Sequence, residues 1–179
     1  MQKKIGISFL IFSLAAFFMI LNNGCSVSYG LNEKVSSIPD STKTIKVNFI
    51  ENRAPYVNPQ LSPTLTDKVK QKITSQTKLT NVSGDNAHWE LSGSITDYSV
   101  ITTGVANQSG NQQATINRLT VTVHITLNKV QQNKIEEFDV SKSFDFSAST
   151  TLQAAEAALL DDMVRNLTDE IFNKLFSDW

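Results

Sequence analysis

The chain is poor in the residues on which most catalytic and metal sites depend. It has one cysteine, two histidines and only three arginines in 179 residues. A single cysteine excludes an internal disulfide, and a zinc site is unexpected without a second cysteine or a histidine pair at ligand spacing. The sequence also lacks a glycine-rich phosphate loop before a helix and a Gly-x-Ser-x-Gly nucleophile elbow. These absences argue against an enzyme and predict no metal and no cofactor.

Charge of either sign is also scarce. Lysine and arginine together number 16 against 17 acidic residues, which gives a net charge of −1 at pH 7. A protein without a basic excess is not expected to bind nucleic acid through its overall field. Any polyanion would have to bind at a local patch.

The N-terminus carries an export signal that ends at the only cysteine. Two lysines precede an apolar run over residues 5–21, which is shorter than the ~20 residues that span a bilayer. The pair Gly24-Cys25 is similar to a bacterial lipobox, although Asn22 stands where an apolar residue is usual. We therefore predict a lipoprotein signal peptide over residues 1–24 and acyl chains, such as palmitate, on Cys25. An ordinary cleaved signal and an uncleaved anchor are the alternatives.

The segment after the cysteine predicts a tether. Residues 25–42 have no sustained apolar period. No second apolar segment reaches membrane-spanning length, so acylated Cys25 would be the only membrane attachment. Ser26 follows it, and the absence of an acidic residue there favours the outer membrane over the inner one.

A single domain is predicted over residues 43–179. Its first strand covers residues 43–50, with Ile45, Val47 and Phe49 on the buried face. A helix follows from Ser62 and Pro63 to about Thr77, because serine caps helices and proline is tolerated at the first helical position.

Three further strands and a helix complete the predicted domain. The strands cover residues 89–102, 116–130 and a segment whose apolar face Lys142 interrupts, a pattern that can mark a bulge. Residues 103–114 are uncharged and predict a polar loop, and the last helix begins at Ser149 or Thr150 and ends near Trp179. The predicted fold class is α+β. Two helices pack on a four-stranded mixed sheet in the order β-α-β-β-β-α, as a two-layer α/β sandwich.

Several short motifs, in this order and spacing, resemble the LptE family of lipopolysaccharide-assembly lipoproteins, and most of all its Bacteroidetes branch. The resemblance runs from about Cys25 to Trp179. The matching fragments are Ile38-Pro39 with Lys43-Thr44-Ile45, Ala54-Pro55, Val57-Asn58-Pro59, Leu61-Ser62, Gly93-Ser94-Ile95-Thr96-Asp97-Tyr98, Asn117-Arg118-Leu119-Thr120 and Ile171-Phe172-Asn173-Lys174 with Trp179.

The resemblance implies a binding protein that catalyses no reaction. Family members form a two-helix, four-stranded sandwich anchored to the outer membrane and facing the periplasm. They plug and help assemble an LptD-type β-barrel translocon and help to insert lipopolysaccharide into the outer leaflet. An LptD-type barrel and lipopolysaccharide are therefore the expected partners.

Lipopolysaccharide carries phosphates, for which arginine is the bidentate partner. Arg118 begins a strand beside the polar loop, while Lys129 and Lys134 flank the next hairpin turn. These three are the predicted lipopolysaccharide-binding residues, with ordinary surface charges as the alternative.

Two other functions remain open from the sequence. A periplasm-facing accessory lipoprotein of a lipid transporter, or a regulator of a cell-wall synthase, would have the same anchor and domain size. An envelope hydrolase would depend on Asp97, Tyr98 or His124.

Overall fold

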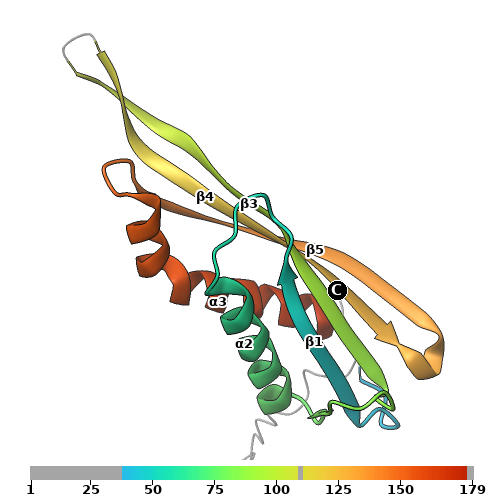
Figure 1. Cartoon of the computed structure of the whole chain (residues 1–179). Helices are drawn as coiled ribbons and strands as arrows, with labels where there is room; N and C mark the ends of the chain where they lie inside the picture. The colour runs from blue at the N-terminus through green and yellow to red at the C-terminus, as the bar shows by residue number, and fades with distance from the viewer. Residues whose placement is uncertain (1–37, 109–110, 177–179) are drawn as a thin grey trace, which may run out of the picture. The chain divides into compact units, whose positions relative to one another are not determined.

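The computed structural model describes residues 38–108 and 111–176, and the predicted signal peptide, tether start and Cys25 lie outside them. The described elements are β1 (Thr44–Asn52), α2 (Leu61–Gln76), β2 (Thr80–Asn81), β3 (Trp89–Gln108), β4 (Asn111–Lys129), the 3-10 helix η1 (Val130–Gln132), β5 (Lys134–Ser147) and α3 (Leu152–Phe176). The strand order in the sheet is β2-β1-β3-β4-β5. β1 pairs in parallel with β2 and β3, and the last three strands form an antiparallel meander. Figure 1 shows both helices on the same side of the sheet.

The α+β class and the helix-on-sheet layers are confirmed, but the sheet has five strands instead of the predicted four. The additional strand is β2, in which only two residues pair with β1. Two residues are too few to produce an apolar period, so the sequence marks this segment only as extended.

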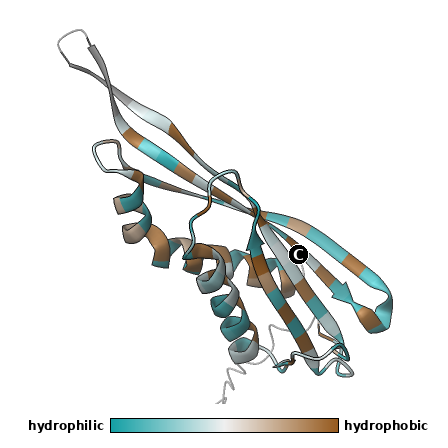
Figure 2. Cartoon of the chain, viewed as in Figure 1, coloured by the Kyte–Doolittle hydropathy of each residue, from teal (hydrophilic) through white to brown (hydrophobic). Residues whose placement is uncertain are grey.

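The core lies between the sheet and the helices. Alternate β4 side chains are fully buried, as the sequence predicts: Leu119, Val121, Val123, Ile125 and Leu127. The apolar stripes of α2 and α3 close over them, through Leu65, Ile73, Met163 and Ile171 among others. Each such side chain contributes roughly 1.5–3 kcal/mol relative to an exposed one. Figure 2 shows the matching alternation of hydropathy along the strands.

The prediction that Phe49 is buried is wrong. The register between β1 and β3 shifts between Val47 and Ile50, which inserts a bulge. Beyond the bulge the faces exchange, so Ile50 is 1% exposed and Phe49 is 55% exposed. The backbone N–H of Ile50 donates to the Thr66 hydroxyl on α2 at 3.0 Å, which holds the bulge against the helix.

The predicted polar loop over residues 103–114 is also wrong, because residues 103–108 and 111–114 continue the strands. β3 and β4 stay paired as far as Gln108 and Asn111. β5 joins this ribbon only at Ile116, opposite Ser147. The far part is therefore two-stranded within the described ranges, and Figure 1 shows it reaching past the helices.

Lys142 does not mark a bulge. The register between β4 and β5 is continuous, with Lys142 opposite the buried Val121. Its ammonium group instead reaches the Glu170 carboxylate on α3 at 2.9 Å. A long side chain at the rim of the core can carry its charge outward in this way.

Both helices begin at residues other than those predicted. α2 starts at Leu61, one residue before Ser62, and the Asn58 side chain accepts the backbone N–H of Gln60 at 3.0 Å just ahead of it. α3 starts at Leu152, and the Thr151 hydroxyl accepts the Ala154 N–H at 3.3 Å. Thr151 therefore caps the N-terminus of α3 with its side chain.

Candidate functional site

Arg118 lies on the face of the sheet opposite the helices. Its neighbour Leu119 is fully buried against the helices, so alternation turns Arg118 the other way. Its guanidinium group makes two parallel hydrogen bonds with the Asp145 carboxylate, at 2.6 and 2.8 Å. These bonds lower the pKa of Asp145. A phosphate at Arg118 would therefore have to compete with a carboxylate of the same chain.

Lys129 and Lys134 are adjacent at the other end of the meander. They are register partners across β4 and β5, and both ammonium groups lie within 2.8 Å of the same Glu136 oxygen. Lys129 also lies over the Trp89 ring, 5.1 Å from its centroid. Partial burial raises the pKa of Glu136, but the two lysines outweigh it, so that pKa lies below the ordinary value.

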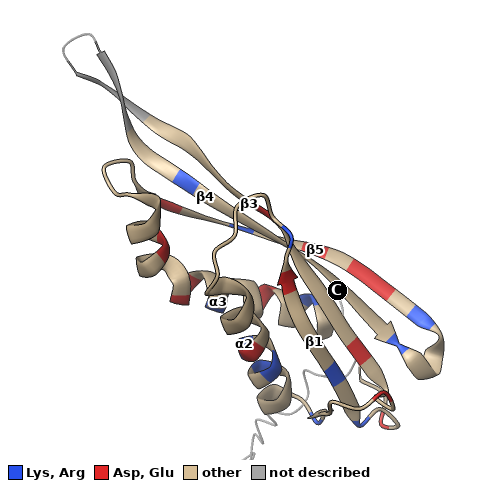
Figure 3. Cartoon of the chain, in the orientation of Figure 1, with Lys and Arg blue, Asp and Glu red and all other residues tan. Residues whose placement is uncertain are grey.

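The structure therefore separates the three predicted lipopolysaccharide-binding cations into two places. Lys129 lies eleven positions after Arg118 on β4, which is roughly 36 Å along a strand. The odd number of positions also puts the two side chains on opposite faces. Figure 3 shows Lys, Arg, Asp and Glu positions spread over the strands and helices. The three cations cannot contact one phosphate together.

The sheet face that carries Arg118 is polar along its middle, with the exposed side chains of Ile101, Ile116 and Ile135 toward its ends, and no described element covers it. Hydroxyl pairs cross from β4 to β5 at 2.9 Å (Thr120 with Ser143) and 3.0 Å (Thr122 with Ser141). His124 follows in the same row and bonds Asp139 at 2.8 Å. We call this surface, made by the outward side chains of β3, β4 and β5, the open face.

Acids outnumber bases on the open face. Its carboxylates are those of Glu90, Asp97, Glu137, Asp139 and Asp145. On the same three strands Arg118 and, when protonated, His124 provide positive charge. This balance disfavours a phosphate-rich ligand and suits a polar protein surface.

A buried polar network beneath the helices was not predicted from the sequence. Tyr98 on β3 donates to Glu156 Oε1 on α3 at 2.7 Å, and Tyr56 donates to Oε2 at 3.2 Å. Asn58 donates to the Tyr98 hydroxyl at 3.4 Å. The two phenol rings stack with centroids 5.4 Å apart. The network joins the segment between β1 and α2 to the sheet and to α3.

The two central groups of this network are shielded from solvent. Tyr98 is 4% exposed and Glu156 is 9% exposed. Burial, with the bond to Glu156, raises the pKa of the Tyr98 phenol, so it remains a proton donor at neutral pH. A ligand in solution cannot reach these groups directly. Their arrangement positions α3 against the sheet.

The hydrolase alternative has little support from geometry. Asp97 and Tyr98 point to opposite faces, since Tyr98 is buried and Asp97 accepts a bond from the neighbouring outward Ser99 at 2.9 Å. Within the described residues no group of three metal-ligating side chains could hold a metal ion.

No helix over residues 38–108 and 111–176 has the length and apolar character needed to cross a bilayer.

The comparisons with known proteins agree with this architecture. A family model described as LptE, lipopolysaccharide-assembly, matches residues 42–175. No curated protein sequence matches the chain.

The solved structures that resemble this chain are distant in sequence. A neuraminyllactose-binding hemagglutinin homolog from Helicobacter pylori is 9% identical and covers 84% of this chain and 90% of its own, with a TM-score of 0.54. Protein XCC0632 from Xanthomonas campestris is 13% identical over 79% and 87%, with a TM-score of 0.50. Rare lipoprotein B from Shewanella oneidensis is 12% identical over 74% and 93%, with a TM-score of 0.46. At these identities the likeness of the first two structures concerns the fold alone.

Proposed function

Because this chain belongs to the LptE family of lipopolysaccharide-assembly proteins, we propose that it is an outer-membrane lipoprotein that plugs and helps assemble an LptD-type β-barrel. In this role it assists the insertion of lipopolysaccharide into the outer leaflet and catalyses no reaction. Cys25 would carry the acyl chains that hold it at the periplasmic side of the membrane. The family match over residues 42–175 is the observation that carries the proposal.

The open face supports a contact with the inside of a barrel. Barrel lumens are polar and wet, so a plug needs a polar outer surface. The hydroxyl pairs of β4 and β5 supply hydrogen-bonding groups without burying unpaired charge. Arg118 and Asp145 neutralise each other on the same face. Such a surface can lie against a polar wall at low desolvation cost.

Site-specific photo-crosslinking in the native membrane tests this placement. We would put a photoreactive residue at Ser143 on the open face and, as the matched control, at the exposed Ala158 on α3. The proposal predicts that the Ser143 variant forms a crosslink to a large outer-membrane barrel protein and that the Ala158 variant does not. Capture of an inner-membrane complex or a cell-wall synthase from Ser143 would contradict the plug and favour an accessory lipoprotein.

A further inference from the structure

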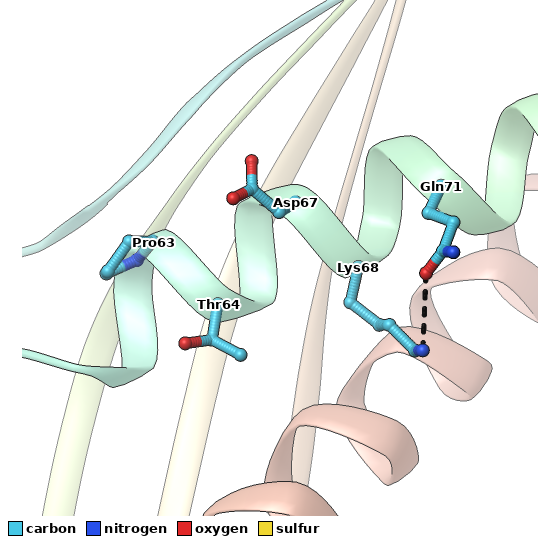
Figure 4. Close-up of a pocket in the computed structure, with 5 residues that line it drawn as sticks. All are labelled: Pro63, Thr64, Asp67, Lys68 and Gln71. Carbon is cyan, nitrogen blue, oxygen red and sulfur yellow. Dashed lines mark hydrogen bonds between the residues drawn. The ribbon is translucent and has the colours of Figure 1, made fainter.

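The helical layer carries a groove between α2 and α3. Its volume is about 280 Å³, and its lining residues come from both helices: Lys68, Gln71, Lys72, Ser75, Gln76, Arg165, Thr168 and Asp169. A second hollow of about 510 Å³ continues along α2 and shares Lys68 and Gln71 with the first. Figure 4 shows this continuation, with Lys68 and Gln71 joined by a hydrogen bond.

Cations outnumber acids in this groove, in contrast to the open face. Lys68, Lys72 and Arg165 face one carboxylate, that of Asp169. Asp169 is paired with Lys72 at 2.5 Å, and Arg165 meets Asp162, outside the lining, at 2.6 Å. Lys68 donates to the neutral Gln71 at 3.3 Å. An ammonium group has three donors and a guanidinium five, so donors remain for an added anion.

The groove also contains a buried hydroxyl without a partner. Thr168 is 2% exposed, and its Oγ1 has no hydrogen-bond partner among the described residues. A buried polar group without a partner costs free energy, and such groups are rare in native structures. A hydroxyl can donate to an anion bound beside it. This hydroxyl is a second feature of the groove, independent of the charges, that a bound anion would satisfy.

From these two observations we propose that the α2–α3 groove binds a phosphomonoester. The guanidinium of Arg165 would contact two phosphate oxygens, the ammonium groups of Lys68 and Lys72 would balance the charge, and Thr168 would donate to a third oxygen. The phosphate belongs either to a glycolipid headgroup or to free phosphate. The proposal deepens the proposed function and rests on it only for the glycolipid source.

Native mass spectrometry of the detergent-solubilised full-length chain measures the binding. The probes are lipid A with its phosphates, lipid A stripped of them by phosphatase, and inorganic phosphate. The test variant is Lys68→Gln with Arg165→Gln, and the matched control is Lys70→Gln, which changes charge on the same helix outside the groove. We expect about tenfold weaker binding of phosphorylated lipid A in the double variant and less than about twofold in the control.

A second variant separates binding from folding. Thr168→Val keeps the shape of the side chain and removes the orphan hydroxyl. The proposal predicts weaker binding by about threefold, with an unfolding midpoint in urea that is unchanged or higher. If Lys70→Gln weakens binding as much as the double variant, if Thr168→Val binds as well as the original chain, or if stripped lipid A binds equally well, the groove is not a phosphomonoester site.

The two sources of phosphate also separate in this experiment. Binding of phosphorylated lipid A without binding of inorganic phosphate supports a headgroup site, and binding of both supports a site for the phosphate group itself. If neither phosphorylated lipid A nor inorganic phosphate binds, the proposal is overturned. None of these results depends on the barrel, so failure of the Ser143 crosslink would leave the groove intact and would contradict only the plug.

Discussion

Replacing Tyr98 by phenylalanine removes one hydroxyl from the buried network and leaves the rest of the packing in place. The phenylalanine ring can still stack on Tyr56, but Glu156 loses its 2.7 Å donor and Asn58 loses its acceptor. A buried polar group left without its partner costs about 1–3 kcal/mol. Glu156 keeps the weaker bond from Tyr56 at 3.2 Å, so we expect a loss of about 2 kcal/mol in the free energy of unfolding.

Urea unfolding followed by circular dichroism measures this loss, and for a domain of this size it corresponds to a fall of about 8 °C in Tm. Tyr56→Phe is the matched control and should have a smaller effect, because Tyr56 is partly exposed. In the double variant Tyr98→Phe with Glu156→Leu, both partners are gone and part of the loss should be recovered. A Tyr98→Phe variant within about 0.5 kcal/mol of the original chain would refute the reasoning.

Three further predictions concern the core, the bulge in β1 and the stability of the fold at acid pH. Gly93→Ala should lower stability by about 1–3 kcal/mol in urea unfolding, because the added Cβ would lie 2.8 Å from Ile125 Cδ1 and 2.9 Å from a β4 carbonyl oxygen. Phe49→Ser should change stability by less than about 0.5 kcal/mol, since the ring is mostly exposed, and a larger loss would contradict the bulge. The hydrogen bond from Lys142 lowers the pKa of Glu170, so this carboxylate stabilises the fold above about pH 4.5 and its contribution disappears as the pH falls through the folded value. Lys142→Met should therefore reduce the acid dependence of stability between pH 6 and 3.

The elements that the sequence predicts best are those whose burial repeats along the chain. Thr120 and Thr122 alternate with buried Leu119 and Val121 on β4, so each residue indicates the orientation of the next. The stripe of α3 is equally regular. In such elements the apolar period of the sequence directly indicates which side chains pack in the core.

The bulge in β1 has no such signal, because it depends on pairing with a distant strand. Ile45, Val47 and Phe49 alternate without interruption, and nothing nearby in the sequence shows that Ile50 takes the buried place. The register of β3 and the hydroxyl of Thr66 decide this. The loop prediction for residues 103–114 is wrong for a related reason. Polar residues without apolar alternation are as typical of a solvated strand as of a loop.

The buried network did leave a signal. Glu156 follows Leu152 by four positions and precedes Leu159 by three, so it lies within the apolar stripe of α3. A carboxyl in such a stripe requires a buried donor, and Tyr98 on β3 supplies it. Which donor it would be could not be predicted, because the pairing spans 58 positions of the chain.

The three predicted cations show the limit of reasoning from position alone. Lys129 and Lys134 lie at the turn between β4 and β5, as the sequence indicates, but the prediction that Arg118 begins a strand is wrong, because β4 already starts at Asn111. The sequence does not show that Asp145 and Glu136 pair with them, or that two faces separate them. Their contribution to lipopolysaccharide binding remains a prediction, and it is tested by comparing Arg118→Ala with Lys134→Ala in the same lipid A assay.

Co-purification of the full-length, lipidated chain from detergent-solubilised membranes tests the central claim most directly, with mass spectrometry of the bound proteins and Cys25→Ala as the control. The account predicts a large outer-membrane β-barrel in near-stoichiometric amount, and less of it when Cys25 cannot be acylated. Recovery of an inner-membrane transporter or a cell-wall synthase in its place, with no barrel, would contradict it.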